Sequence, residues 1–381
     1  MKSMTELQQD VSKCTRCGNC QYYCPTFSVS RLETHVARGR LQLVKRSLES
    51  EGEFSDSFRK RLNQCLLCGN CSQNCPPGIS IEDIVERTRE MGVGQAGPPQ
   101  GMALAAKNIA DVGNITGDSR ENRLLWLENM APGSVKVGGK AEVVYFAGCV
   151  PTLYPSSYSI PQTFSGLLNK AGLDWAVMGE SENCCAYPLL IGGMREDAIK
   201  VMEQNARDLA ALGARRLVTT CPSCYHMWKE IYPKYVAVMP EVEVLHETQL
   251  VAELIKKGAF QFKEMAGTVT YHDSCDLGRK SGVYDVPREV LSAIPGVKLV
   301  EMKFNKENAY CCGGGGNLEM NDTALSGKVA QQRIAQALDT GADVIVTSCQ
   351  QCKRTLANGA RQKRARIKIV DVSELVSSAI V

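Results

Sequence analysis

Four groups of cysteines hold the residues of this sequence that could do chemistry. They account for all 18 cysteines in the chain of 381 residues. Thiolates spaced C-x2-C-x2-C-x3-C-P are typical of paired [4Fe-4S] clusters, in which the fourth cysteine of each run binds the other cluster. Two of the groups have this spacing, and their members are Cys14, Cys17, Cys20 and Cys24, then Cys65, Cys68, Cys71 and Cys75.

The rule for such runs assigns the eight cysteines crosswise to two cubane clusters. One cluster takes Cys14, Cys17, Cys20 and Cys75, and its partner takes Cys65, Cys68, Cys71 and Cys24. A pair of zinc sites is the alternative, but a tetrahedral zinc site does not require this run twice. A c-type haem is disfavoured because no C-x2-C-H occurs.

The other ten cysteines belong to an internal repeat. The sequence VVYFAGC corresponds to VTYHDSC, and LGARRLVTTCPSC corresponds to TGADVIVTSCQQC. A duplicated unit of about 125 residues follows from this self-similarity. The two sets of five are Cys149, Cys184, Cys185, Cys221 and Cys224, then Cys275, Cys311, Cys312, Cys349 and Cys352.

Adjacent cysteines limit the kind of centre that each set could hold. Cys184 and Cys185 direct their side chains differently, so both reach one centre only if it is larger than a single ion, and a polynuclear cluster satisfies this condition. One zinc ion on four of the five thiols is an alternative. A thioredoxin-like pair at Cys221 and Cys224 is another, but it does not explain the repeat.

Two features near these cysteines are candidates for supporting roles. His272 lies three residues before Cys275 and could donate a hydrogen bond to a cluster thiolate or move a proton, which makes it the one weak catalytic candidate. A polar residue satisfied at a strand end is the alternative. The glycines at 313–316 lack the phosphate-loop pattern, so we expect them to bring backbone amides close to cluster sulfurs.

The pattern of apolar residues predicts an α+β multidomain protein. A helical pattern that includes Leu41 and Val44 dominates the first part, and Ser80 with Asp83 resembles a capping box that starts a further helix. Later, short apolar runs alternate with helical patterns and predict parallel sheets, in which ligands bind at the carboxyl ends of strands. Four runs lead directly into a cysteine: 143–146, 217–220, 269–271 and 344–347.

We therefore expect four segments along the chain. Residues 1–91 form a helical domain with the first two cysteine groups, and 92–139 form a Gly/Pro-rich linker and helical connector. Two pseudo-symmetric α/β units follow, the first unit over 140–262 and the second unit over 263–381.

Composition excludes several classes of function. The formal net charge of +3 is too small to indicate a nucleic-acid surface. The sequence has no apolar stretch of about 18 residues and no signal-peptide core at its start, so we expect neither a membrane span nor export. A cytoplasmic location follows, where cysteines serve metals more often than disulfides.

Together these motifs resemble the heterodisulfide reductase D-type family, whose relatives include the iron-sulfur subunits of glycolate oxidase and D-lactate dehydrogenase. The similarity lies in both cysteine runs, CCGGGG at 311–316, and CPSC and CQQC, and it extends over nearly the whole chain. It implies a helical dicluster ferredoxin domain followed by two CCG domains. It also implies that each set of five cysteines holds a noncubane [4Fe-4S] cluster.

The resemblance implies an electron-transfer subunit. Electrons would pass between a flavoprotein dehydrogenase of the 2-hydroxy acid oxidase type, or an electron-transfer flavoprotein, and a quinone or other acceptor. A membrane cytochrome b or quinone-reactive partner would hold the chain at the membrane periphery. The alternative is a catalytic subunit that reduces a disulfide or another small acceptor at the paired noncubane clusters; an open cavity between them would favour it.

Two residues depart from the family pattern. Ala186 follows Cys184 and Cys185 where the family usually has glycine, so zinc or an altered centre is an alternative in the first unit. Asp276 follows Cys275 where relatives often carry histidine, which leaves the protonating role of that position open. The sequence names neither the electron donor nor the final acceptor.

Overall fold

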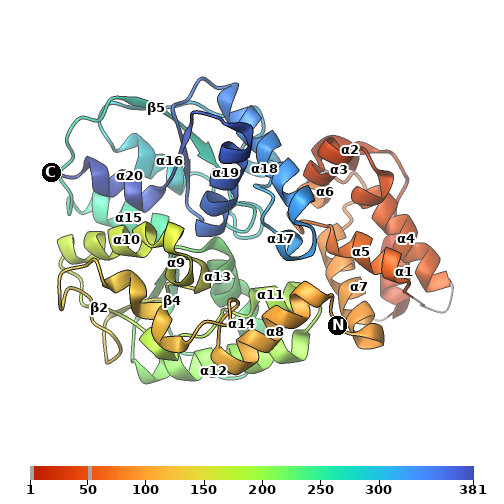
Figure 1. Cartoon of the computed structure of the whole chain (residues 1–381), viewed down its shortest axis with the longest axis horizontal. Helices are drawn as coiled ribbons and strands as arrows, with labels where there is room; N and C mark the ends of the chain where they lie inside the picture. Colours follow the sequence, from red (N-terminus) through yellow and green to blue (C-terminus); the bar gives the residue numbers. More distant parts are fainter. Residues whose placement is uncertain (1–3, 50–53) are drawn as a thin grey trace.

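The computed structural model describes residues 4–49 and 54–381 of the chain. Figure 1 shows a helical N-terminal domain, coloured red to orange, beside two α/β bodies that lie one above the other. Each α/β body contains its own parallel four-stranded sheet. The predicted fold class, a helical domain followed by two pseudo-symmetric α/β units, is confirmed.

The helical domain is built from short helices around the two loops that carry the first eight cysteines. Leu41 and Val44, which the sequence placed on one helical face, are buried in its core. The elements are α1 (Met4–Ser12), α2 (Asn19–Tyr23), α3 (Pro25–Ser30), the turn η1 (Glu33–His35), α4 (Ala37–Glu49), α5 (Asp56–Asn63), α6 (Asn70–Gln73) and α7 (Ile81–Ala96).

The start of α7 differs from the sequence prediction in one detail. The helix begins at Ile81 as expected, but the Ser80 side chain makes no capping hydrogen bond. Ser72 replaces it: its Oγ accepts a hydrogen bond from the Ile81 amide at 2.8 Å and donates one to Glu82. The second cysteine run, which contains Ser72, is thereby tied to the helix that follows.

A connector leads from the helical domain into the first unit through α8 (Gln100–Val112) and the 3-10 helix η2 (Arg120–Leu127). The first unit then contains β1 (Val143–Tyr145), α9 (Cys149–Leu153), η3 (Pro155–Ser157), α10 (Ser159–Lys170), β2 (Trp175–Val177), η4 (Gly179–Ser181), α11 (Tyr187–Ile191), α12 (Arg195–Ala211), β3 (Arg216–Thr219), α13 (Pro222–His226), the π-helical η5 (Met227–Ile231), α14 (Tyr232–Tyr235), β4 (Glu243–His246) and α15 (Glu247–Lys256).

The second unit repeats this plan. Its elements are β5 (Gly267–His272), α16 (Val286–Ser292), β6 (Val297–Leu299), η6 (Lys306–Asn308), α17 (Leu318–Asn321), α18 (Thr323–Leu338), β7 (Val344–Thr347), α19 (Gln350–Lys363), β8 (Lys368–Asp371) and α20 (Val372–Ala379).

The two sheets have the same topology, with strand orders β2-β1-β3-β4 and β6-β5-β7-β8. The central pairs are parallel and in matching register, Val144 opposite Leu217 and Thr270 opposite Ile345. Parallel central strands end at the same edge of a sheet. The four apolar runs of the sequence are these central strands, so each sheet brings two of its cysteine-bearing loops together.

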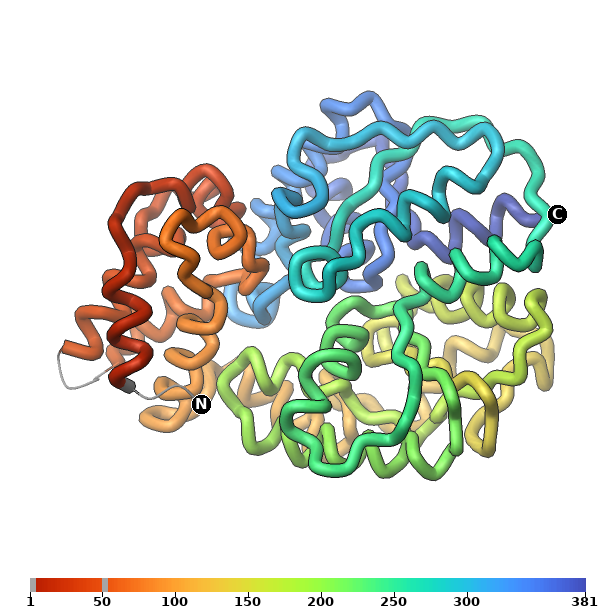
Figure 2. Tube along the Cα trace, turned by 180° about the vertical axis from the view of Figure 1, so that it is seen from behind, coloured from red at the N-terminus to blue at the C-terminus, as the bar shows by residue number. Residues whose placement is uncertain are grey.

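The two units share part of their hydrophobic core. Phe164 on α10 and Leu250 on α15 belong to the same buried cluster as Leu291 on α16 and Val376 on α20. Figure 2 shows the first unit (yellow to green) and the second unit (cyan to blue) in contact along this layer of helices. Continuous burial of this kind fixes the two sets of five cysteines relative to each other.

Candidate metal centres

One small cavity of the helical domain is lined by Cys14, Cys17, Cys20 and Cys75. Cys17 is exposed and the other three are partly buried, so this site lies near the surface. Arg16 and Gly18 have left-handed backbone, with φ of 59° and 82°, and they fold the loop back on itself between the cysteines. The four cysteines that the crosswise rule assigns to one cluster therefore surround one space.

A second cavity is lined by Cys24, Cys65, Cys68 and Cys71. It lies deeper, because the first three of these cysteines are buried. Its loop repeats the same backbone geometry, with Leu67 and Gly69 at φ of 47° and 74°. Burial raises the pKa of Cys68 to about 12. A metal cation would stabilise the thiolate that burial disfavours, so this all-thiol donor set fits a bound cluster.

All ten remaining cysteines line a single cavity of about 400 Å³ between the two α/β units. The cavity therefore has five thiols on each side. Its wall also includes Tyr154 and Tyr187, the glycines at 314–316, and the polar side chains of Asp276 and Arg354. The cavity lies at the carboxyl edges of both sheets, where a parallel α/β architecture places ligand-binding residues.

The five thiols on each side follow one another in the same order. In the first unit, neighbouring thiols interact in the series Cys149, Cys184, Cys185, Cys224 and Cys221. The second unit has the equivalent series Cys275, Cys311, Cys312, Cys352 and Cys349. Five adjoining thiols exceed the four ligands of a tetrahedral zinc ion and fit a polynuclear cluster.

Cys185 and Cys312, which take equivalent positions in the two units, both have a lowered pKa. Hydrogen bonds from Cys184 and then Cys224 lower the pKa of Cys185 to about 6. Hydrogen bonds from Cys311 and then Cys352 lower the pKa of Cys312 to about 6. A lowered thiol pKa favours the thiolate, which is the form that binds metals.

The glycine loop of the second unit packs directly on the second cavity of the helical domain. A Cβ atom at Gly316 would lie 2.3 Å from the Cys65 carbonyl oxygen, and one at Gly315 would lie 3.0 Å from that of Leu66. Arg89 joins the two loops, because its guanidinium donates to the carbonyls of Cys65 (2.8 Å) and Gly316 (3.1 Å). The glycines thus let the loop backbone lie against the backbone of the helical domain. They also bring an amide to a thiol, because the Gly314 amide donates to Cys312 Sγ at 3.3 Å.

Arg279 adds a second link at the same place. Its Nε donates to the Cys68 carbonyl at 2.6 Å, while Cys275 lies only four residues away in the sequence. Burial opposes the charged form of Arg279, but its position beside Cys68, Cys275 and Cys311 outweighs burial and raises its pKa. Sequence reasoning missed this arginine, because nothing local shows that it faces another domain.

Ala186 takes the position where the family pattern has glycine. Its backbone is left-handed, with φ of 69°, as is that of its counterpart Gly313 at 100°. The Ala186 side chain is fully buried among the residues around the first set of thiols. The methyl group therefore leaves the five thiols of the first unit in the same order as those of the second.

A buried arginine that the sequence did not indicate reaches the first set of thiols. Arg123 on η2 donates from Nη2 to Cys149 Sγ at 3.3 Å and from Nη1 to Glu182 Oε1 at 3.0 Å. Glu182 in turn accepts hydrogen bonds from the amides of Ala147 and Gly148. The connector thus supplies a positive charge to the first centre.

Asp276 links the two units across the cavity wall. Its carboxylate accepts hydrogen bonds from Ser223 Oγ at 2.5 Å and Tyr187 Oη at 3.2 Å, both in the first unit. Lys280 lies 3.1 Å from the same carboxylate and donates to Tyr187 Oη at 3.0 Å. Asp276 therefore replaces the family's histidine with an ion pair and two cross-unit hydrogen bonds. The sequence singled out Asp276 but missed Lys280 and Tyr187.

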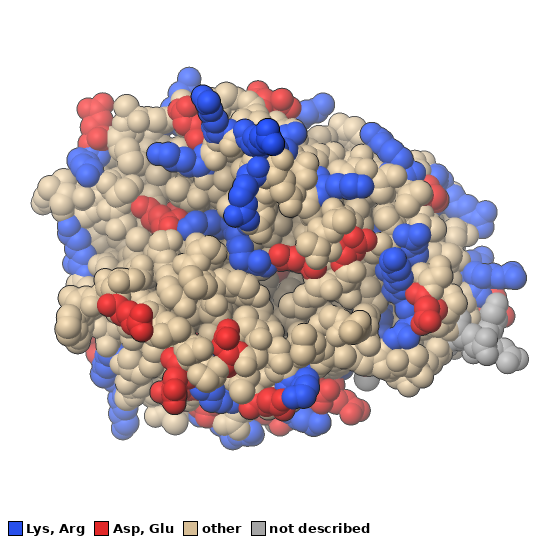
Figure 3. All heavy atoms as spheres, viewed as in Figure 1, with Lys and Arg blue, Asp and Glu red and all other residues tan. Residues whose placement is uncertain are grey.

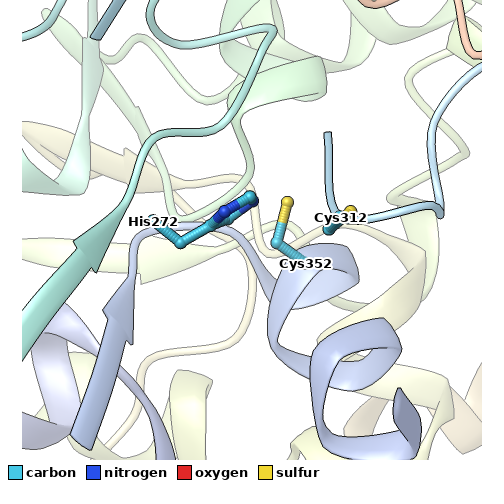
Figure 4. Close-up of side chains that lie close together, drawn as sticks. All are labelled: His272, Cys312 and Cys352. Atoms are coloured by element: carbon cyan, nitrogen blue, oxygen red, sulfur yellow. The ribbon is translucent and has the colours of Figure 1, made fainter. Parts of the chain in front are cut away.

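His272 lies at the end of β5 beside the second set of thiols. One ring nitrogen and the sulfurs of Cys312 and Cys352 all lie within 4.8 Å of one another. Figure 4 shows the imidazole pointing toward the two cysteines. His226 has a different neighbour, because its Nδ1 lies 3.4 Å from Ser281 Oγ. His246 caps the start of α15. Of these three histidines, only His272 belongs to this group of possible metal ligands.

The charge of the surface and the length of the apolar helices limit the kinds of partner. Over the face drawn in Figure 3, Lys and Arg are interspersed with Asp and Glu, so neither sign covers it continuously. Among the described residues, no helix is long and apolar enough to cross a membrane.

Comparison with known proteins identifies the family of this chain. The family model of the 4Fe-4S dicluster domain matches residues 10–79, and that of the cysteine-rich CCG domain matches 143–229 and 269–357. The D-type subunit of the dihydromethanophenazine:CoB–CoM heterodisulfide reductase of Methanosarcina acetivorans is 34% identical, over 100% of this chain and 96% of that one. The chain belongs to the heterodisulfide reductase D-type family. The two family models indicate that the chain holds iron-sulfur clusters.

Other relatives of this chain are longer. The probable iron-sulfur-binding oxidoreductase FadF of Bacillus subtilis is 31% identical, and this chain spans 60% of it. The EtfAB:quinone oxidoreductase of Syntrophomonas wolfei is 27% identical, and this chain spans 58% of it. A solved structure of a hypothetical protein from Helicobacter pylori shares the fold, with a TM-score of 0.58 at 10% identity over the whole of this chain and 77% of that one.

Proposed function

We propose that this chain carries electrons through two cubane clusters to two noncubane [4Fe-4S] clusters, where a small acceptor of the disulfide class is reduced. Its relatives include one component of a heterodisulfide reductase and an EtfAB:quinone oxidoreductase, which supports the electron-transfer function predicted from the sequence. The cubanes take the two sets of four cysteines. The noncubane clusters take the two sets of five.

The observation that carries the catalytic part is the single cavity lined by all ten cysteines. A pure relay needs only close packing between its centres, whereas a reductase needs space for an acceptor between them. The clusters themselves would fill part of this volume, so it is the position of the cavity between two thiol-lined walls that supports the reductase kept as an alternative from the sequence, with electron relay as the step that feeds it. Bound clusters would supply single electrons at both walls of this cavity.

The chain's own residues hold the acceptor space in place. Asp276, Lys280 and Tyr187 form a hydrogen-bonded group at the junction of the two units and keep the walls at a fixed separation. Cleaving a disulfide to two thiols takes two electrons and two protons, so a site that reduces one needs polar groups beside its metal centres. These three side chains supply such groups.

Electron donation would take place at the exposed edge of the first cubane. Cys17 is exposed, whereas three of the four cysteines of the other cubane are buried, so a partner can approach only the first one closely. We propose a flavoprotein dehydrogenase or an electron-transfer flavoprotein as that partner. A membrane cytochrome b or quinone-reactive subunit is the second candidate, and it would hold this cytoplasmic chain at the membrane.

A disulfide reductase assay tests the proposal. Anaerobic protein with its clusters receives electrons from reduced methyl viologen in the presence of 2-hydroxyethyl disulfide. We expect two viologens to be oxidised for each disulfide cleaved, and we expect the Cys184→Ser and Cys311→Ser variants to lose this turnover. Protein that exchanges electrons with a reduced electron-transfer flavoprotein but leaves the disulfide intact would instead be a relay to another acceptor.

A further inference from the structure

The second unit contains a buried histidine whose hydrogen bonding is fixed by its surroundings. His272 is 1% exposed, and its Nδ1 lies 3.1 Å from Nε of Arg333 on α18. Arg333 is itself held in place, because its Nη1 donates to the carbonyl oxygen of Phe304 and to Gln336, both at 2.8 Å. The other ring nitrogen, Nε2, is buried without a partner among the described residues.

The contact with Arg333 determines which nitrogen of His272 carries the proton. A guanidinium only donates hydrogen bonds, so Nδ1 must be the acceptor. A neutral imidazole with an acceptor at Nδ1 has its proton on Nε2. An imidazole whose Nδ1 accepts this hydrogen bond carries only one proton, so the ring is neutral. Nε2 is then a donor and has no lone pair to offer a metal ion.

The imidazole points at sulfur ligands of the second unit. It extends from the end of β5 toward Cys312 and Cys352 (Figure 4). A donor buried here without a partner would destabilise the fold, so a sulfur of the second centre is the acceptor that the surroundings offer. Hydrogen bonds to cluster sulfurs stabilise the more negatively charged, reduced cluster and so raise its reduction potential.

The first unit lacks this donor. The repeat places Phe146 opposite His272, because VVYFAGC corresponds to VTYHDSC. Phe146 is fully buried and packs edge-on against Trp228, with ring centroids 5.6 Å apart. The two units therefore differ at this position by one buried hydrogen-bond donor, while their thiols follow the same order.

We propose that His272 is a positioning residue that donates Nε2–H to a sulfur of the second unit's cluster, in the tautomer set by Arg333, and raises the reduction potential of that cluster. The inference rests on the clusters assigned above. It adds that electrons arriving from the helical domain are held at the second unit before the first unit is reduced.

Redox titration of the protein with its clusters, followed by EPR, tests the proposal. Cluster potentials are compared between the wild type and His272→Phe, which installs the first unit's residue. We expect the ratio of reduced to oxidised second cluster at a fixed potential to fall about tenfold, a shift of about 59 mV to lower potential for a one-electron couple. The first unit's potential should stay unchanged.

Two further variants control for packing. His272→Gln keeps a donor of similar length and should restore part of the shift, whereas Phe146→His should leave the second cluster alone. HYSCORE spectra of the reduced wild type should show an exchangeable proton near the cluster and only weak nitrogen coupling. Both features should disappear in His272→Phe.

Each failure has a distinct meaning. If the second unit gives no cluster signal in the wild type, the cluster assignment and this inference both fall. If the signal is present but its potential is the same in His272→Phe, only the role of His272 falls. Strong nitrogen coupling would identify His272 as an iron ligand and would overturn the tautomer argument.

Discussion

The two α/β units have the same strand order and the same series of five thiols but different surroundings for the sulfurs. In the first unit, the connector supplies Arg123 as a donor to Cys149. In the second unit, His272 lies beside the thiols and the loop at 313–316 packs on the helical domain. A duplicated scaffold thus surrounds two equivalent sets of thiols differently, and the glycine loop of the second unit lies against the second cavity of the helical domain.

Replacing equivalent cysteine ligands in the two units should give the largest difference between them. Cys311→Ser should remove the second unit's cluster and also slow reduction of the first unit, because the second unit provides the contact with Cys65 and Leu66. Cys184→Ser should remove only the first unit's cluster and leave the second reducible. Rapid-freeze EPR after mixing with reduced viologen measures both.

Cys14→Ser is the matched variant outside the repeat. It should damage the exposed cubane and slow reduction by a protein donor while both α/β units stay folded. If Cys311→Ser retained every wild-type EPR signal at full intensity, the ligand assignment for the second unit would be wrong.

The contact of the glycine loop with the helical domain gives the next largest effect. Gly316 has φ of 60°, and an added Cβ would meet the Cys65 carbonyl oxygen at 2.3 Å. Gly316→Ala should therefore lower the free energy of unfolding by more than the approximately 1–2 kcal/mol that left-handed backbone costs other residues. It should also slow electron transfer between the domains.

Gly341→Ala is the control for that variant. Gly341 also has left-handed backbone, with φ of 72°, but an added Cβ would meet nothing within 4 Å. Chemical denaturation of both variants separates the cost of left-handed backbone, which both share, from the cost of the steric clash, which only Gly316→Ala has. Equal destabilisation, with unchanged electron transfer in Gly316→Ala, would show that the close approach has no importance for function.

A smaller effect concerns the residue after each pair of adjacent cysteines. Ala186→Gly should stabilise the first unit by about 1 kcal/mol or less, because it relieves left-handed strain but adds flexibility to the unfolded chain. Gly313→Ala should destabilise the second unit, since the new Cβ would lie 2.5 Å from the Ser326 carbonyl oxygen. The midpoints of unfolding in urea should rise in Ala186→Gly and fall in Gly313→Ala. Midpoints that shift in the same direction in both variants would contradict this difference between the units.

The smallest expected effect is a pH dependence at the interface of the units. Burial raises the pKa of Asp371 to about 6, with the negative charge of Glu374 as the next cause. The folded protein therefore binds this proton more tightly than the unfolded chain, and the stability it contributes is lost as pH rises through 6. The loss between pH 5 and pH 7 should be about 1 kcal/mol.

Asp371→Asn keeps the helix cap and cannot ionise. Its counterpart in the first unit is His246. Burial lowers the pKa of His246 to about 3, so this residue is uncharged over the same pH range, as the replaced side chain in Asp371→Asn would be. Denaturant titrations at several pH values should show a shallower slope in Asp371→Asn than in the wild type between pH 5 and 7. Identical slopes would show that Asp371 does not cause the pH dependence of stability.

The sequence predicted the repeat, the helical domain and the central strands because each has a local signal. Cysteine spacing marked the centres, and the short apolar runs before Cys149 and Cys349 marked strands that are buried in the structure. The four edge strands were missed because they are short and none leads directly into a cysteine; they cover 175–177, 243–246, 297–299 and 368–371. The capping box at Ser80 was wrong because Ser72, from the cysteine loop, caps the helix instead.

The site was predictable only as far as chemistry is local in the sequence. The sequence could not show that Arg123 reaches Cys149 or that Lys280 pairs with Asp276 beside Tyr187, because these contacts depend on how the domains pack. It also could not show that ten thiols share one cavity. That arrangement depends on the core shared by α10, α15, α16 and α20.

The most direct test of the central claim is the metal content of anaerobically purified protein. Four iron-sulfur centres predict about 16 iron atoms per chain, with acid-labile sulfide present and little zinc. About 8 iron atoms together with bound zinc would confine redox chemistry to the helical domain and contradict the assignment of clusters to the two α/β units.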